Sequence, residues 1–142
     1  MADIDWKNLR SSAFDVMRRA YAPYSGFPVG AAALTESGRV VVGCNVENVS
    51  LGLTLCAENV LVGNLFSSGS GRLAAVACCD SEGAPLMPCG RCRQVLLEHG
   101  GAGLLIDCGD ADSVGPIALG DLLPRAFGPA ERASGRLGGD PL

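Results

Sequence analysis

The chain has little charge, few aromatic side chains and a single histidine. Charged residues make up 18% of its 142 residues, aromatic residues 5%, and His99 is the one histidine. Lys and Arg number only 11 and the formal net charge is -4, so the basic stripe typical of nucleic-acid binders is missing. No apolar run approaches the roughly 20 residues of a membrane helix, and residues 1–5 lack the basic and apolar regions of a signal peptide. We therefore expect a cytoplasmic protein that binds a small uncharged molecule, with no nucleic acid and no membrane as partner.

Cysteine is plentiful by contrast. Seven cysteines in a cytosolic chain favour metal binding or catalysis over disulfides. Four of them lie in or beside apolar, strand-like runs and are expected to be buried, unreactive thiols: Cys44, Cys78, Cys79 and Cys108. The other three form two clusters, Cys56-Ala57-Glu58 and Pro88-Cys89-Gly90-Arg91-Cys92.

Apolar periodicity and turn residues divide the chain into alternating helices and strands. Hydrophobic residues make up 48% of the chain, which suits one domain with a packed core. Helices are predicted over 6–21, 56–66 and 89–99, and strands over 27–34, 39–44, 73–79 and 104–108, with a last strand and helical turn within 117–123. This order predicts a sheet sandwiched by helices, with parallel strands where strand and helix alternate.

The two cysteine clusters have the spacing of a metal site. Cys89 and Cys92 are three residues apart, so on a helix they share a face, and Cys56 joins them from a different helix. Three thiolates can hold zinc and leave its fourth position free. Glu58, two residues after Cys56, faces another way and could move protons at that open position. A four-cysteine structural site or simply buried thiols remain alternatives, and His99 suits a surface role at a helix end better than metal ligation.

Five segments carry a resemblance to a known family: residues 27–31, 43–48, 53–58, 88–94 and 122–128, which read FPVGA, GCNVEN, LTLCAE, PCGRCRQ and LLPRAFG. In these segments the chain resembles the small homotetrameric zinc-dependent cytidine deaminases. The resemblance implies a three-layer α/β/α sandwich with a mixed five-stranded sheet. It also implies a single domain over residues 1–128 and a flexible C-terminal tail over 129–142. The implied activity is zinc-dependent hydrolytic deamination of cytidine and 2′-deoxycytidine, as in pyrimidine salvage.

The same resemblance implies a role for each matching residue. Zinc would be held by Cys56, Cys89 and Cys92 with water as its fourth ligand, and Glu58 would transfer protons to the base and to the leaving ammonia. Substrate contacts would come from Phe27 against the nucleoside, Asn45 and Glu47 on the ribose hydroxyls, the Ala57 backbone at the base, and Phe127 reaching the base in a neighbouring subunit. The chain would therefore form a homotetramer with shared active sites.

The chain departs from the family pattern at a few positions. Asn59 stands where many members carry an arginine that softens the charge of the thiolates, and we hypothesise that Arg91 or Arg93 partly replaces it. Leu51 stands where an aromatic residue is frequent. Two other functions stay open on the sequence: deamination of a cytosine-containing nucleoside antibiotic of the blasticidin type, and a non-catalytic zinc-stabilised module.

Overall fold

The computed structural model describes residues 3–109 and 115–128. Its centre is a five-stranded sheet in the order β2-β1-β3-β4-β5. The strands are β1 (Gly30–Thr35), β2 (Val40–Cys44), β3 (Leu73–Cys79), β4 (Leu105–Ile106) and β5 (Ile117–Ala118). β1 pairs antiparallel with both β2 and β3, β3 pairs parallel with β4, and β4 pairs antiparallel with β5. The predicted mixed sheet of five strands is confirmed.

The three strands that helices connect, β2, β3 and β4, all run the same way, as predicted. β1 lies between β2 and β3 and is antiparallel to each. The hairpin formed by β1 and β2 explains this order, because its first strand takes the central place and the crossover through α2 (Ala57–Ser67) must pass over it. Among the described strands, only β3 and β4, which α3 (Gly90–Gly100) connects, are both parallel and neighbours in the sheet.

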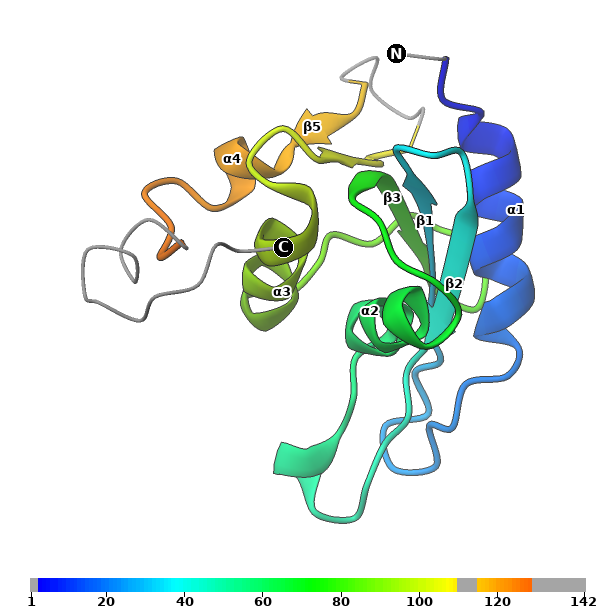
Figure 1. Cartoon of the computed structure of the whole chain (residues 1–142). Helices are drawn as coiled ribbons and strands as arrows, with labels where there is room; N and C mark the ends of the chain where they lie inside the picture. The colour runs from blue at the N-terminus through cyan, green and yellow to red at the C-terminus, as the bar shows by residue number, and fades with distance from the viewer. Residues whose placement is uncertain (1–2, 110–114, 129–142) are drawn as a thin grey trace.

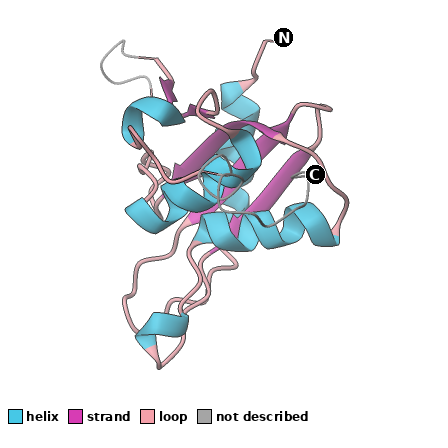
Figure 2. Ribbon diagram, turned by 60° about the vertical axis from the view of Figure 1, so that its left-hand side comes forward, coloured by secondary structure: helices cyan, strands magenta, loops and turns pink. Residues whose placement is uncertain are grey.

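Helices cover both faces of the sheet (Figure 1, Figure 2). Helix α1 (Trp6–Met17) packs on one face against β1, β2 and β3, whereas α2 and α3 pack against each other and against the opposite face. Successive residues of a strand point to opposite faces, so each face has its own core. The core under α1 includes Leu9, Ala13, Met17, Ala32, Ala77 and Cys79, and the core under α2 and α3 includes Ala31, Val41, Leu61, Val76, Cys78 and Leu96.

Several element boundaries differ from the predicted ones by a few residues. The first helix ends at Met17 rather than at 21, because the backbone of Tyr21 instead bonds in strand fashion to Asn45 and Glu47. Helices α2 and α3 each begin one residue later than predicted, since Cys56 and Cys89 take the extended N-cap conformation. The predicted strand over 104–108 shortens to Leu105–Ile106.

A short 3₁₀ helix, η1 (Leu51–Leu53), lies in the segment before α2, where the sequence predicted only a connector. The last strand is followed by α4 (Leu119–Leu122), as expected for 117–123. The predicted tail over 129–142 lies outside the described residues. Within residues 3–109 and 115–128, every helix is too short or too polar to cross a membrane.

Close contact between β2 and α2 fixes the start of the helix that carries Glu58. A Cβ atom added to Gly43 would lie 2.3 Å from the Leu61 nitrogen and 2.5 Å from the Ala57 carbonyl oxygen. Both atoms belong to the backbone of α2, so neither can move aside without moving the helix. Glycine at position 43 therefore lets α2 sit against the sheet.

We predict that Gly43→Ala lowers the free energy of unfolding by about 3 kcal/mol, because the methyl group meets rigid backbone. Gly63→Ala is the matched control, since Gly63 is exposed on α2 and a Cβ there meets no atom within 4 Å. In an exposed helix position that change should raise stability by about 0.5–1 kcal/mol. Urea unfolding of both variants measures the difference, and equal stabilities would contradict this packing.

Candidate metal centre and active site

The structure brings the three predicted ligands together. The sulfur atoms of Cys56, Cys89 and Cys92 all lie within 4.8 Å of one another. Cys56 is the N-cap of α2, Cys89 is the N-cap of α3, and Cys92 follows in the first turn of α3. Two helix N-termini therefore meet at one point, and their positive dipole ends favour negatively charged sulfur there.

The pKa values of the three thiols show the effects of burial and of the negative charges nearby. Burial raises the pKa of the Cys92 thiol, and the charges of Glu58 and Cys56 raise it further. Burial likewise raises the pKa of Cys56. Burial alone would also raise the pKa of Cys89, but hydrogen bonds from the Cys92 backbone and from the thiols of Cys92 and Cys56 hold it below its usual value. A bound divalent cation would reverse the upward shifts, since thiols that coordinate a metal lose their protons. Three sulfur donors favour zinc among the common cations.

Glu58 lies beside the sulfur cluster rather than within it. It sits in the first turn of α2 with only 5% of its surface exposed. One carboxylate oxygen, Oε2, accepts a hydrogen bond from the Cys92 thiol at 3.3 Å, and the other, Oε1, accepts one from the Cys78 thiol at 3.6 Å. The carboxylate is therefore held at the edge of the three-thiol site.

An open cavity of about 350 Å³ leads to these residues. Its lining includes two of the three sulfur ligands, the carboxylate and several apolar side chains. The lining residues are Ser25, Phe27, Val29, Asn45, Thr54, Cys56, Ala57, Glu58, Leu86, Met87 and Cys89. An apolar lining with a few polar groups is typical of a small-molecule binding site.

The two residues predicted to bind ribose differ in position. Asn45 lines the cavity, where its Nδ2 donates to the Phe27 carbonyl at 2.9 Å and its Oδ1 accepts from the Val29 amide at 2.8 Å. Glu47 is not among the lining residues. Its carboxylate accepts from the Ser25 hydroxyl and from the amides of Tyr24 and Ser25, and the hydroxyl bond is the main reason for its lowered pKa. Ser25 itself borders the cavity.

Phe127 also lies outside this cavity of its own chain. It is 59% exposed and follows α4, and its carbonyl accepts a hydrogen bond from Gln94 Nε2 at 2.8 Å. Arg93 holds the same segment by donating to the Leu122 carbonyl at 2.8 Å. The C-terminal segment is thus fastened to α3, with the Phe127 ring exposed at the surface.

The structure corrects the sequence interpretation for Cys78. Cys78 is buried as predicted, but its thiol contacts the Glu58 carboxylate instead of packing only against apolar groups. Strand alternation could have placed Cys78 on the face under α2. It could not have predicted the contact with a carboxylate that comes from another element. His99, in the last turn of α3, packs edge-on against Phe66 with ring centres 5.1 Å apart.

Arg91 lies next to Asn59, the position where the family often has an arginine. With the Asn59 amide oxygen facing the guanidinium, it accepts from Nε and Nη2 of Arg91, each at 3.3 Å. Arg91 also donates to the Thr54 carbonyl at 3.3 Å. Arg93 donates to the carbonyls of Pro88 and Leu122. The hypothesis that either arginine offsets the charge of the thiolates stays a prediction.

Comparison with known proteins identifies a family of matching sequence and structure. Residues 5–106 match the family profile described as the cytidine and deoxycytidylate deaminase zinc-binding region. A cytidine deaminase from Mycobacterium tuberculosis is 63% identical over 128 residues, which cover 90% of this chain and 93% of that protein. A cytidine deaminase from Halalkalibacterium halodurans is 38% identical over 125 residues, covering 87% and 95% of the two chains.

Solved structures agree with the sequence matches. The crystal structure of the M. tuberculosis cytidine deaminase superposes with a TM-score of 0.83, covering 89% of this chain and 99% of that chain at 63% identity. The crystal structure of a Mycobacterium leprae cytidine deaminase gives a TM-score of 0.81 at 47% identity, covering 87% and 100%.

We predict that the purified protein holds one zinc ion per chain, and that Cys92→Ser abolishes zinc retention because a buried hydroxyl does not replace a thiolate. The matched control is Cys108→Ser, which changes a cysteine outside the cluster. Elemental analysis after dialysis against a chelator measures the zinc content. Zinc retained by Cys92→Ser, or lost equally from both variants, would contradict the three-thiol site.

Proposed function

The chain belongs to the cytidine and deoxycytidylate deaminase family, and from that premise we propose that it converts cytidine and 2′-deoxycytidine to uridine and 2′-deoxyuridine. Each turnover consumes one water and releases one ammonia. The observation that carries the proposal is the position of Glu58, whose carboxylate reaches both the three-thiol cluster and the cavity. A carboxylate in that place has a task in proton transfer, which a non-catalytic zinc module does not need.

Cys56, Cys89 and Cys92 would hold a zinc ion, and that ion would supply a Lewis acid that lowers the pKa of water to about 7. Glu58 performs the proton transfers. It accepts one proton from water and delivers it to N3 of cytosine as C4 is attacked. It then takes the proton of the new hydroxyl group at C4 and gives it to the amino group, which leaves as ammonia while the C4 carbonyl forms. Because Glu58 is buried, its proton reaches the substrate rather than bulk solvent.

The cavity walls would orient the nucleoside. Ala57 and Phe27 both line the cavity, so the Ala57 backbone would lie against the base and the Phe27 ring would pack on the nucleoside. Asn45 fixes the backbone of Phe27 and Val29, and its amide keeps further hydrogen-bonding capacity for a ribose hydroxyl. Glu47 would accept from the second hydroxyl beside Ser25. A carboxylate at this position suits a neutral sugar and disfavours a phosphorylated one. The two residues assigned to ribose hydroxyls favour a ribose-bearing nucleoside over an antibiotic of the blasticidin type.

We further propose a homotetramer whose subunits share their active sites. The segment around η1 and the connection from α1 to β1 extend beyond the sheet (Figure 1, Figure 2). Large apolar side chains are exposed along them, namely Tyr21, Tyr24, Val46, Val49, Leu51, Leu53 and Leu55. A surface of this kind is normally covered by another protein surface, and a second copy of the chain would cover it. Phe127, exposed on its anchored segment, would then enter a neighbouring cavity.

This proposal assigns residues 1–128 to one catalytic domain that acts in the cytoplasm in pyrimidine salvage. All seven cysteines are unpaired. Reduced thiols of this kind are maintained in the cytosol, and zinc binding requires three of them.

We predict that Glu58→Gln lowers the turnover number for cytidine by about 10³-fold, because the amide cannot carry the proton. Zinc content and the urea midpoint should stay near those of the unchanged protein, since glutamine has the same shape. The fall in ultraviolet absorbance as cytidine becomes uridine measures the rate. A zinc-loaded wild-type protein without turnover, or full activity in Glu58→Gln, would contradict the proposed function.

We predict that Phe127→Ala lowers kcat/KM by about tenfold or more, because an aromatic anchor at the base is lost. Co-expression of Phe127→Ala with Glu58→Gln should restore activity, since a shared site can take Glu58 from one chain and Phe127 from its neighbour. Kinetics of the purified mixed tetramers measure the restoration. Activity no greater than the sum of the two parent variants would show that the sites are not shared.

A further inference from the structure

We propose that Cys78 is a positioning residue for the deamination, holding the Glu58 carboxylate in place by donating its thiol hydrogen to Oε1. This inference rests on the proposed function and adds to it a residue outside the family motifs that the sequence analysis singled out. It concerns a thiol that contacts the proton-transfer group and not the metal cluster.

The contact is buried on both sides. Cys78 is 3% exposed and Glu58 is 5% exposed, and their polar atoms lie 3.6 Å apart. Cys78 and Glu58 come from different elements, β3 and α2, and lie 20 residues apart in the chain. A buried carboxylate oxygen needs a donor, and this thiol is the partner that the structure gives to Oε1.

Zinc binding makes this donor more important. In the described structure Glu58 accepts from two thiols, Cys92 at Oε2 and Cys78 at Oε1. Cys92 belongs to the three-thiol cluster, and a cysteine that ligates zinc has lost its proton. Cys78 lies outside the cluster and keeps its proton, because burial and then the Glu58 charge raise the pKa of its thiol. In the zinc-loaded protein, Cys78 is thus the thiol that can still donate to Glu58.

The backbone of β3 fixes where the thiol points. Cys78 pairs with Ala31 of β1 in the middle of the sheet, and its carbonyl accepts from the Leu86 amide at 2.9 Å. Leu86 in turn lines the cavity. A donor attached to a central strand holds the carboxylate more firmly than one on a loop would, and firm placement is what a proton-transfer group requires.

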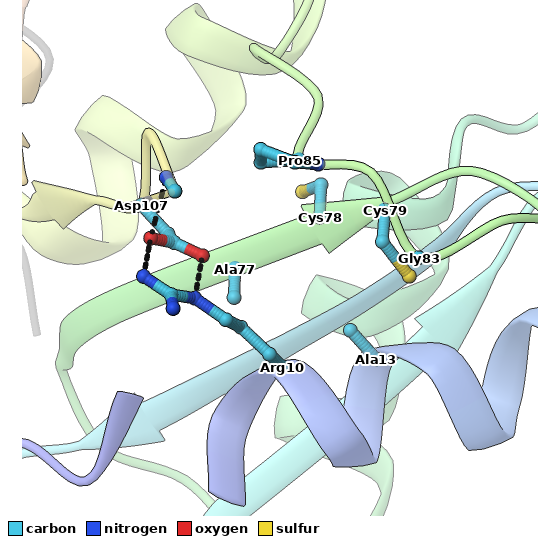
Figure 3. A pocket seen from close by; sticks show the side chains of 9 residues that line it. Arg10, Ala13, Ala77, Cys78, Cys79, Gly83, Pro85 and Asp107 are labelled. Carbon is cyan, nitrogen blue, oxygen red and sulfur yellow. Dashed lines mark hydrogen bonds and ion pairs between the residues drawn. The ribbon is translucent and has the colours of Figure 1, made fainter. Parts of the chain in front are cut away.

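The next residue, Cys79, offers a matched control. It is also buried, but strand alternation turns it toward α1 and into the opposite core. Figure 3 shows the two side chains leaving β3 on different sides, near a small cavity of about 150 Å³ that the Arg10–Asp107 ion pair borders. Replacing Cys79 therefore removes a buried thiol of the same strand without touching Glu58.

The test compares Cys78→Ala, Cys78→Ser and Cys79→Ala as zinc-loaded proteins with cytidine. We expect Cys78→Ala to lower kcat about tenfold, with KM within about twofold, because a donor to a charged group is lost while the substrate contacts stay. Cys78→Ser keeps a donor and should stay within about threefold of the wild-type kcat. Cys79→Ala should keep the wild-type kcat, and all three should retain zinc.

A second measurement detects the hydrogen bond of the thiol directly. The S–H stretching band of a thiol shifts when its hydrogen bond is broken, so the infrared difference between zinc-loaded wild type and Glu58→Ala should contain a shifted thiol band. That band should be missing from Cys78→Ser. An unshifted thiol band, wild-type kcat in Cys78→Ala, or equal loss of kcat in the alanine and serine variants would overturn the inference. Absence of turnover in the wild type would instead overturn the proposed function.

Discussion

The meeting of two helix N-termini is the constraint on which this structure depends. Cys56 is the N-cap of α2 and Cys89 is the N-cap of α3, so a metal ligand immediately precedes each helix, and both helices direct the positive ends of their dipoles toward the same point. Four acidic groups gather there, three thiols and the Glu58 carboxylate. Without a cation, burial and mutual repulsion raise the pKa of two of the thiols. With a bound cation, the three thiols would be deprotonated, and the two helix starts would fix their positions.

Contacts with the sheet hold α2 and its carboxylate in position. Gly43 lets α2 approach β2 at backbone distance, and Cys78 extends from β3 to the carboxylate that α2 carries. The loop after β3 leads to Leu86, which lines the cavity, and then to the other two ligands, Cys89 and Cys92. Strand order and helix position are therefore not separate from the chemistry. They determine where the Glu58 carboxylate and the three thiols meet.

Much of this arrangement could be predicted from the sequence, because its signals are local. The spacing of Cys89 and Cys92 on one helix, the Cys56–Glu58 pair and the apolar run of β3 each depend on neighbouring residues. What could not be predicted depends on tertiary contacts. The contact of Cys78 with Glu58 requires knowing how α2 lies on β3, and the early end of α1 follows from the pairing of Tyr21 with a segment 25 residues away. The place of β1 between β2 and β3 is likewise a choice of topology that the order of elements leaves open.

The most direct test of a three-thiol, open zinc site is X-ray absorption at the zinc edge of the metal-loaded protein in solution. Our account predicts three sulfur neighbours at about 2.3 Å and one lighter neighbour at about 2.0 Å. That lighter neighbour should remain in Glu58→Gln, since the carboxylate lies beside the metal site and is not a ligand. Four sulfur neighbours, or loss of the lighter neighbour in Glu58→Gln, would contradict the account.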